Sequence, residues 1–180
     1  MPSESQCGGP KDVPRNSKGY TLIELIVVMV LIGLMTALTV PRFRYAVLTD
    51  NLKTTTRKLV GVAKGLRSEA VREHQTFVLH FDLESNQFWV DSAGMTEEER
   101  ILAREKASSL PRGVRILDVW LMGKGKKMTG ETAIRFNKNG YVQQSVIHLG
   151  ADDGREFTLV LSPFLRRVKV IENYVEFEES

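Results

Sequence analysis

Cysteine is almost absent from this sequence. Cys7 is the only one in 180 residues, so no disulfide can form within the chain. An apolar fraction of 42% is enough to build an ordinary core, and the fold must rely on that core rather than on covalent cross-links. A lipoprotein signal places its cysteine after an apolar run, whereas Cys7 precedes the run that begins at Tyr20. We therefore exclude Cys7 as a lipid attachment site.

Histidine is scarce, and common catalytic motifs are missing. His74, His80 and His148 are the only histidines, and none stands in an HExxH or HxH pair, so we expect surface or strand-face positions for them. No GxSxG segment occurs. The single cysteine lies in the polar segment before the apolar run, so we do not expect it to form a Cys/His nucleophile. The sequence predicts neither an enzyme nor a protein that needs a cofactor or a metal.

Two polar segments have the composition of ligand loops but not their spacing. Residues 123–127 contain glycine and lysine without the GxxxxGK[ST] order of a phosphate loop, so we predict a solvated loop over residues 123–130. Asp152 and Asp153 are adjacent and precede Gly154, and Ca²⁺ prefers six or more oxygen ligands. A turn is the simpler interpretation of that pair.

One long apolar run is present, over residues 20–40. As a helix it would span about 31 Å, close to the thickness of the hydrocarbon layer of a membrane. Glu24 is its only charged residue. A carboxylate in hydrocarbon costs about 2.5–3.5 kcal/mol on insertion scales, so Glu24 requires a partner. Lys11, Arg15 and Lys18 precede the run, which favours a cytoplasmic N-terminus. An ordinary single-span anchor with an incidental glutamate is the alternative.

The start of this run resembles the class III signal of type IV pilins and type II secretion pseudopilins. The resemblance is carried by residues 19–25, Gly19-Tyr20-Thr21-Leu22-Ile23-Glu24-Leu25. It implies cleavage by prepilin peptidase between Gly19 and Tyr20, N-methylation of Tyr20 and an assembly contact through Glu24. Pro41 matches the proline that kinks the helix in this family. Tyr20 departs from the family, which usually has phenylalanine there.

Charge pairing gives a physical reason to keep Glu24. Cleavage after Gly19 would create an α-amine that is mostly protonated at neutral pH. In a filament this ammonium can approach Glu24 of a neighbouring subunit. At about 4 Å and an effective dielectric constant of about 20, the attraction is on the order of 4 kcal/mol before desolvation. Glu24 would therefore favour the stacked subunit over the isolated one.

We divide the chain into four parts. Residues 1–19 form a cleaved cytoplasmic leader, 20–40 a transmembrane and assembly helix, 41–73 an amphipathic helix and 74–180 a periplasmic head. In the amphipathic part Leu52, Leu59 and Leu66 recur at helical spacing. Gly61 and Gly65 are predicted to let a strand approach this helix closely. The expected fold class is α+β, with one long kinked N-terminal helix packed on a mainly antiparallel, β-sandwich-like head.

Within the head the apolar period changes from helical to two. A hairpin is predicted over residues 76–81 and 87–90, then a helix over 96–107 that begins with a capping box at Thr96. The further strands are expected at residues 114–121, 133–137, 142–149, 156–161, 168–171 and 174–177. Short turns such as Asn139-Gly140 join them, which favours antiparallel pairing.

The head resembles the GspH/FimT group of minor pseudopilins, through residues 67–72, 110–114 and 134–136 with Asn139-Gly140. This resemblance implies a single-pass protein of the bacterial inner membrane with a periplasmic head, at or near the tip of a short pseudopilus. The implied partners are prepilin peptidase, other pseudopilins, the inner-membrane assembly platform and, at the tip, secreted substrate.

A basic segment near the C-terminus leaves two interpretations open. Arg167 and Lys169 share one face of a predicted strand, and Arg166 points to the other face. Some FimT-like pilins resemble this arrangement, and there a basic motif captures DNA for uptake by a type IV pilus. A net charge of only +3 does not indicate a nucleic-acid partner, and a basic strand edge that discourages aggregation is the simpler interpretation.

Overall fold

The computed structural model describes residues 19–163 and 167–177, and for residues 37–50 it describes the backbone only. The chain divides into two compact units, residues 1–41 and residues 42–180. One helix, α1 (Leu22–Arg72), has residues in both units. The second unit holds nine strands and one further helix among the described residues.

Helix α1 enters the head core along one stripe. Leu52, Leu59 and Leu66 are at most 5% exposed, and Ala63 and Ala70 lie on the same stripe. This confirms the predicted amphipathic helix. The expected role of Gly61 and Gly65 is wrong, because a Cβ atom built on either glycine would meet no atom within 4 Å. Both glycines face open space rather than a strand.

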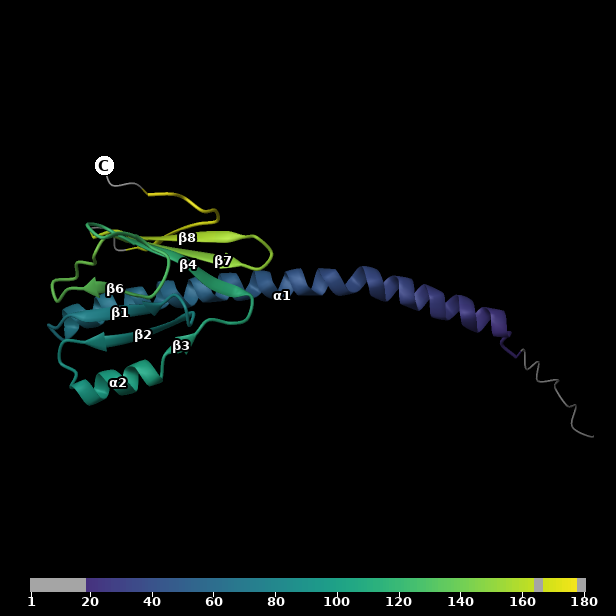
Figure 1. The fold of residues 1–180 in the computed structure, drawn as a ribbon, viewed down its shortest axis with the longest axis horizontal. Coiled ribbons are helices and arrows are strands. Elements are labelled where there is room, and N and C mark those ends of the chain that lie inside the picture. The colour runs from purple at the N-terminus through teal and green to yellow at the C-terminus, as the bar shows by residue number, and fades with distance from the viewer. Residues whose placement is uncertain (1–18, 164–166, 178–180) are drawn as a thin grey trace, which may run out of the picture. The chain divides into compact units, whose positions relative to one another are not determined.

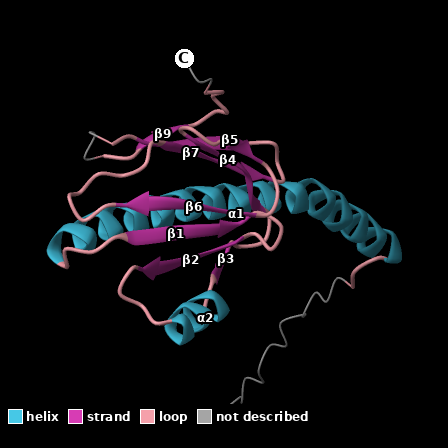
Figure 2. Cartoon of the chain, turned by 60° about the vertical axis from the view of Figure 1, so that its left-hand side comes forward, coloured by secondary structure: helices cyan, strands magenta, loops and turns pink. Residues whose placement is uncertain are grey.

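The head contains two antiparallel sheets (Figures 1 and 2). The first has the order β3-β2-β1-β6. Its strands are β1 (Phe77–Asp82), β2 (Gln87–Ser92), β3 (Ser108–Ser109) and β6 (Glu131–Phe136). The second has the order β5-β4-β7-β8-β9. Its strands are β4 (Val114–Leu121), β5 (Gly125–Lys127), β7 (Ser145–Ala151), β8 (Glu156–Leu161) and β9 (Lys169–Ile171).

One hydrophobic core joins both sheets to α1. It includes Leu59 from the helix, Phe81 and Ile134 from the first sheet, and Val119 and Leu149 from the second. All five are at most 1% exposed. Both sheets lie alongside the C-terminal half of α1 (Figure 1). The α+β class and the antiparallel, sandwich-like head are therefore confirmed.

Asn86 ties the first sheet to the second. It lies in the β1–β2 turn with φ of 54°, in the left-handed region that asparagine tolerates better than most residues. Its side-chain amide donates to the carbonyl of Val114 at 2.7 Å and accepts from the amide of Ile116 at 2.9 Å. Both ends of one amide are thus satisfied by the first residues of β4.

Helix α2 (Glu97–Glu105) begins as predicted. The Thr96 hydroxyl accepts from the Glu99 amide, and the Glu99 carboxylate accepts from the Thr96 amide, which completes a capping box. The helix has no buried residue, and it packs beside β2. Arg104 reaches from it to the ring of Trp89, 5.4 Å from the ring centroid, and pairs with Glu131.

Two predicted elements differ from the structure. The loop expected over residues 123–130 contains β5. This strand pairs with the end of β4, so the two strands form a hairpin. Residues 174–177, predicted as a strand, have no ladder partner in the described part of the chain. The backbone of Val175 instead bonds to the side chains of Thr158 and His148. The apolar alternation in this segment reflects contact with a sheet face rather than pairing at a sheet edge.

Candidate processing and assembly site

The predicted processing and assembly residues gather at the beginning of α1. Gly19 and Tyr20 precede the helix in an exposed, non-helical stretch, and the side chain of Tyr20 is 82% exposed. The Thr21 hydroxyl accepts from the amide of Glu24 at 3.3 Å. Glu24 therefore lies in the first turn, where the unpaired amides of a helix favour a negative charge.

The residues after Glu24 form an exposed apolar surface. Every described side chain from Leu22 to Thr36 is exposed. The large apolar ones are Leu22, Ile23, Leu25, Ile26, Val27, Val28, Met29, Val30, Leu31, Ile32, Leu34 and Met35. A helix that is apolar on all sides requires burial in a membrane or against other helices. Glu24 is the only ionisable group between residues 22 and 36.

Membrane insertion and the kink stay predictions. Within the described residues, no helix has both the length and the hydropathy for a bilayer crossing. Pro41 lies inside the bounds of α1, but its side chain is outside the described residues. The leader, residues 1–18, lies outside them as well.

The basic C-terminal segment lies at the edge of the second sheet. Lys169 is the first residue of β9, an edge strand, and both Lys169 and Arg167 are exposed, whereas Val168 packs against the core. Arg166 lies outside the described residues. A groove beside this edge is lined by Lys53, Arg57 and Lys64 of α1 together with Glu172. Cations therefore outnumber carboxylates along this side of the head.

The other predicted candidates have structural partners. His80 lies on a face of β1, where it stacks on Trp89 with ring centroids 5.1 Å apart and contacts Asp91 at 2.9 Å. Asp153 forms a turn, as predicted, and its carboxylate accepts from the side chain of Arg155 at 3.0 Å. The hydrogen bond from Arg155 lowers the pKa of Asp153.

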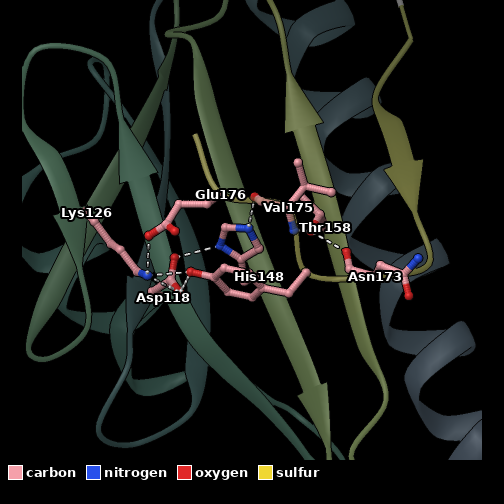
Figure 3. A network of polar contacts seen from close by, with 8 residues as sticks. Asp118, Lys126, His148, Thr158, Asn173, Val175 and Glu176 are labelled. Atoms are coloured by element: carbon pink, nitrogen blue, oxygen red, sulfur yellow. Dashed lines mark hydrogen bonds and ion pairs between the residues drawn. The ribbon is translucent and has the colours of Figure 1, made fainter. Parts of the chain in front are cut away.

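A buried polar cluster in the second sheet was not predicted (Figure 3). Asp118 and His148 are each 2% exposed, and Asp118 Oδ1 lies 2.7 Å from His148 Nδ1. The Tyr174 hydroxyl donates to Asp118 Oδ2 at 3.0 Å, and the Lys126 ammonium lies 3.7 Å from the same oxygen. Burial raises the pKa of Asp118, but the hydrogen bond and charge of His148, with Tyr174 and Lys126, outweigh burial and lower it.

This cluster attaches residues 173–177, here called the C-terminal strap, to the sheet. His148 Nε2 donates to the carbonyl of Val175 at 2.9 Å. The Thr158 hydroxyl donates to the carbonyl of Asn173 at 2.6 Å and accepts from the amide of Val175 at 3.1 Å. These bonds hold the strap over the outer face of the sheet at His148. Every residue of β7 is buried, although only alternate residues belong to the core. The sequence signal was an aspartate and a histidine inside two apolar strands.

Together, an N-terminal helix with an exposed apolar surface and an antiparallel β head define the architecture of the chain. A family model described as the prokaryotic N-terminal methylation motif matches residues 14–40. That range includes Gly19, Tyr20 and Glu24. No curated protein matches the sequence.

The solved structures that resemble the chain include two of the minor pseudopilin EpsH from the type II secretion system of Vibrio cholerae. One has a TM-score of 0.52 and 13% identity and covers 71% of this chain and 98% of EpsH. The other has a TM-score of 0.48 and 12% identity and covers 68% and 97%. The first of these shows that the chain shares the fold of a minor pseudopilin.

Proposed function

We propose that this protein is a minor pseudopilin, a structural subunit at or near the tip of the periplasmic pseudopilus of a type II secretion system. The observation that carries the proposal is the exposed apolar surface of residues 22–36 with its single carboxylate, Glu24, in the first helical turn. The methylation motif over residues 14–40 and the fold shared with EpsH support it.

In this proposal the protein is the substrate of an enzyme rather than an enzyme. Prepilin peptidase removes residues 1–19 on the cytoplasmic side, and the new terminus at Tyr20 is methylated. The apolar helix holds the subunit in the inner membrane until the assembly platform transfers it to the filament. There, Glu24 pairs with the terminal ammonium of an adjoining pseudopilin, and the head contacts other tip subunits or secreted substrate.

The decisive experiment is mass spectrometry of the N-terminus after co-expression with prepilin peptidase. We expect the chain to begin with N-methyltyrosine at position 20, and a Gly19→Val variant to retain residues 1–19. A wild-type chain that keeps its leader and still enters a pseudopilus would overturn the proposal.

A second candidate is a FimT-like minor pilin that binds DNA. It is favoured by the exposed Arg167 and Lys169 and by the neighbouring groove with Lys53, Arg57 and Lys64. Phosphate binding needs several such cations on one surface. A strain without the gene separates the two functions: lost secretion of extracellular proteins supports the pseudopilin, and lost DNA uptake supports the pilin.

A further inference from the structure

The C-terminal strap is held almost entirely by side chains of the second sheet. It forms no ladder with β8 or β9, since its Val175 backbone bonds to the side chains of Thr158 and His148 (Figure 3). Trp120 is 7% exposed, and its ring lies 6.4 Å from that of Phe177 in the strap. The strap is thus a cover over the face of the sheet opposite the core, and His148 is at the centre of its attachment.

The two contacts of His148 fix the number of protons on its ring. The carbonyl of Val175 can only accept, so Nε2 carries a hydrogen. Asp118 Oδ2 already accepts from the Tyr174 hydroxyl and lies 3.7 Å from the Lys126 ammonium. This hydrogen bond and this positive charge favour the ionised carboxylate, so Nδ1 donates to Oδ1. His148 is therefore an imidazolium that donates from both nitrogens.

Loss of one proton must break one of these two contacts. A neutral ring that keeps its Nδ1 hydrogen for the carboxylate presents a lone pair to the carbonyl of Val175. A neutral ring with the hydrogen on Nε2 instead presents a lone pair to Asp118 Oδ1 at 2.7 Å. The first arrangement keeps the stronger, charge-assisted bond to Asp118. Its lone pair on Nε2 then repels the carbonyl oxygen of Val175 in the strap.

We propose that the C-terminal strap is held in a pH-dependent way, and that loss of one imidazole proton from His148 releases it and uncovers Trp120. The docked state binds a proton that the released state does not require, so rising pH favours release. The inference is independent of the proposed function.

The surroundings of His148 are consistent with this role. Among the described residues, Lys126 from β5 and Tyr174 from the strap contact Asp118, and Glu176 from the strap lies 3.9 Å from Lys126. The ring of Tyr174 stacks on His148 with centroids 4.0 Å apart. Burial raises the pKa of Tyr174, so its phenol keeps its proton throughout the neutral pH range. Lys126 remains charged in the same range because its hydrogen bond to Tyr174 raises its pKa.

The test uses the full-length protein in detergent with Trp89→Phe, which leaves Trp120 as the only tryptophan. We expect its emission to shift to the red, reversibly, as pH is raised across and beyond the interval of about 5 to 8 in which histidine side chains change charge. Amide exchange at Val175 should accelerate with the same midpoint, and ¹⁵N spectra should show two N–H groups on His148 below it. Constant emission, or a singly protonated His148 with the strap docked, would refute the inference.

Three variants distinguish His148 from its neighbours. Tyr174→Phe should keep the transition, because the phenol is not the sensor. Thr158→Val removes two strap bonds without touching the ionised pair, and it should expose Trp120 already at low pH. His80→Gln is the matched control, since His80 also contacts an aspartate but lies on the other sheet. If the transition disappears in His80→Gln, then His80 rather than His148 causes it, and the inference is overturned.

Discussion

Asp118 faces His148 because β4 carries one extra residue. Ile116 pairs with Leu149 and Asp118 pairs with His148, so Leu117 is bulged between them. Val114 and Ile116 point into the core before the bulge, and Val119 and Leu121 do so after it. A regular strand that began with the same register would place Asp118 on the core face. The bulge therefore turns Asp118 and Trp120 to the outer face, where the strap covers them.

Removing the carboxylate from this pair should be costly. Asp118→Asn leaves the His148 charge buried with a neutral partner, and breaking a buried pair in this way typically costs about 3–5 kcal/mol of the free energy of unfolding. Chemical denaturation checks this value. The matched control is Asp91→Asn, whose half-buried pair with His80 should be worth at most about 1 kcal/mol. Equal losses in the two variants would contradict the assignment of Asp118 and His148 as a buried ion pair.

The same carboxylate gives stability a definite sign with pH. The pKa of Asp118 is lower in the folded chain than its ordinary value, so its contribution is present above the unfolded pKa. It is lost as pH falls through the folded pKa. Wild-type protein should therefore lose stability on acidification, as denaturation midpoints measured at several pH values will show, and Asp118→Asn should lose less over the same range.

Gly150 should not tolerate a side chain while Leu117 is in place. A Cβ atom there would lie 2.8 Å from Leu117 Cδ2 and 3.1 Å from Cγ, so the bulged residue would have to move. We expect Gly150→Ala to lower the free energy of unfolding by about 1–3 kcal/mol. The double variant with Leu117→Ala should cost less than the sum of the two single changes. Strict additivity in this double-mutant cycle would show that the two residues do not interact.

Gly61 should accept alanine with a gain in stability. It lies inside α1, and a Cβ atom there meets nothing within 4 Å. Alanine is more favourable than glycine in a helix by about 1 kcal/mol, so the unfolding midpoint of Gly61→Ala should rise. Gly65→Ala, in equally open space, is the parallel case. A fall in stability in both would mean that this helix face is packed.

Glu24→Gln tests the proposed assembly contact. The substitution preserves the size of the side chain and leaves the bond between the Thr21 hydroxyl and the backbone amide of residue 24 in place. Membrane insertion and cleavage should be unchanged, whereas incorporation into the pseudopilus should fall at least tenfold, because an attraction of about 4 kcal/mol before desolvation is lost. Glu24→Asp, which keeps the charge, should retain part of the assembly. Normal incorporation of the glutamine variant into filaments would refute the contact.

Arg167 and Lys169 decide between the two candidate functions. If the exposed edge binds DNA, full-length protein in detergent should retard DNA in a gel, and the double alanine variant should bind several-fold more weakly with a smaller salt dependence. If the protein is a pseudopilin, that variant should support secretion like the wild type. Lys106→Ala, beyond the end of α2, serves as a charge control far along the sequence.

Local patterns in the sequence determined much of this protein. The Thr96 capping box, the hairpin around residues 84–86, the leucine stripe from Leu52 to Leu66 and the sandwich-like antiparallel head are all observed as predicted. Each depends on interactions between residues close in sequence or on a simple apolar period. The motif at Gly19, Tyr20 and Glu24 is of the same kind, because its information lies in fixed spacing.

Tertiary structure alone decided where the polar residues of the strands belong. The bulge at Leu117 changes which face Asp118 occupies, and no local pattern indicates such a change of parity. His148 and Thr158 are buried only because residues 173–177 return across the sheet. The bonds that hold these residues join positions 15 to 56 apart in the chain, so no pattern within a single strand could indicate them.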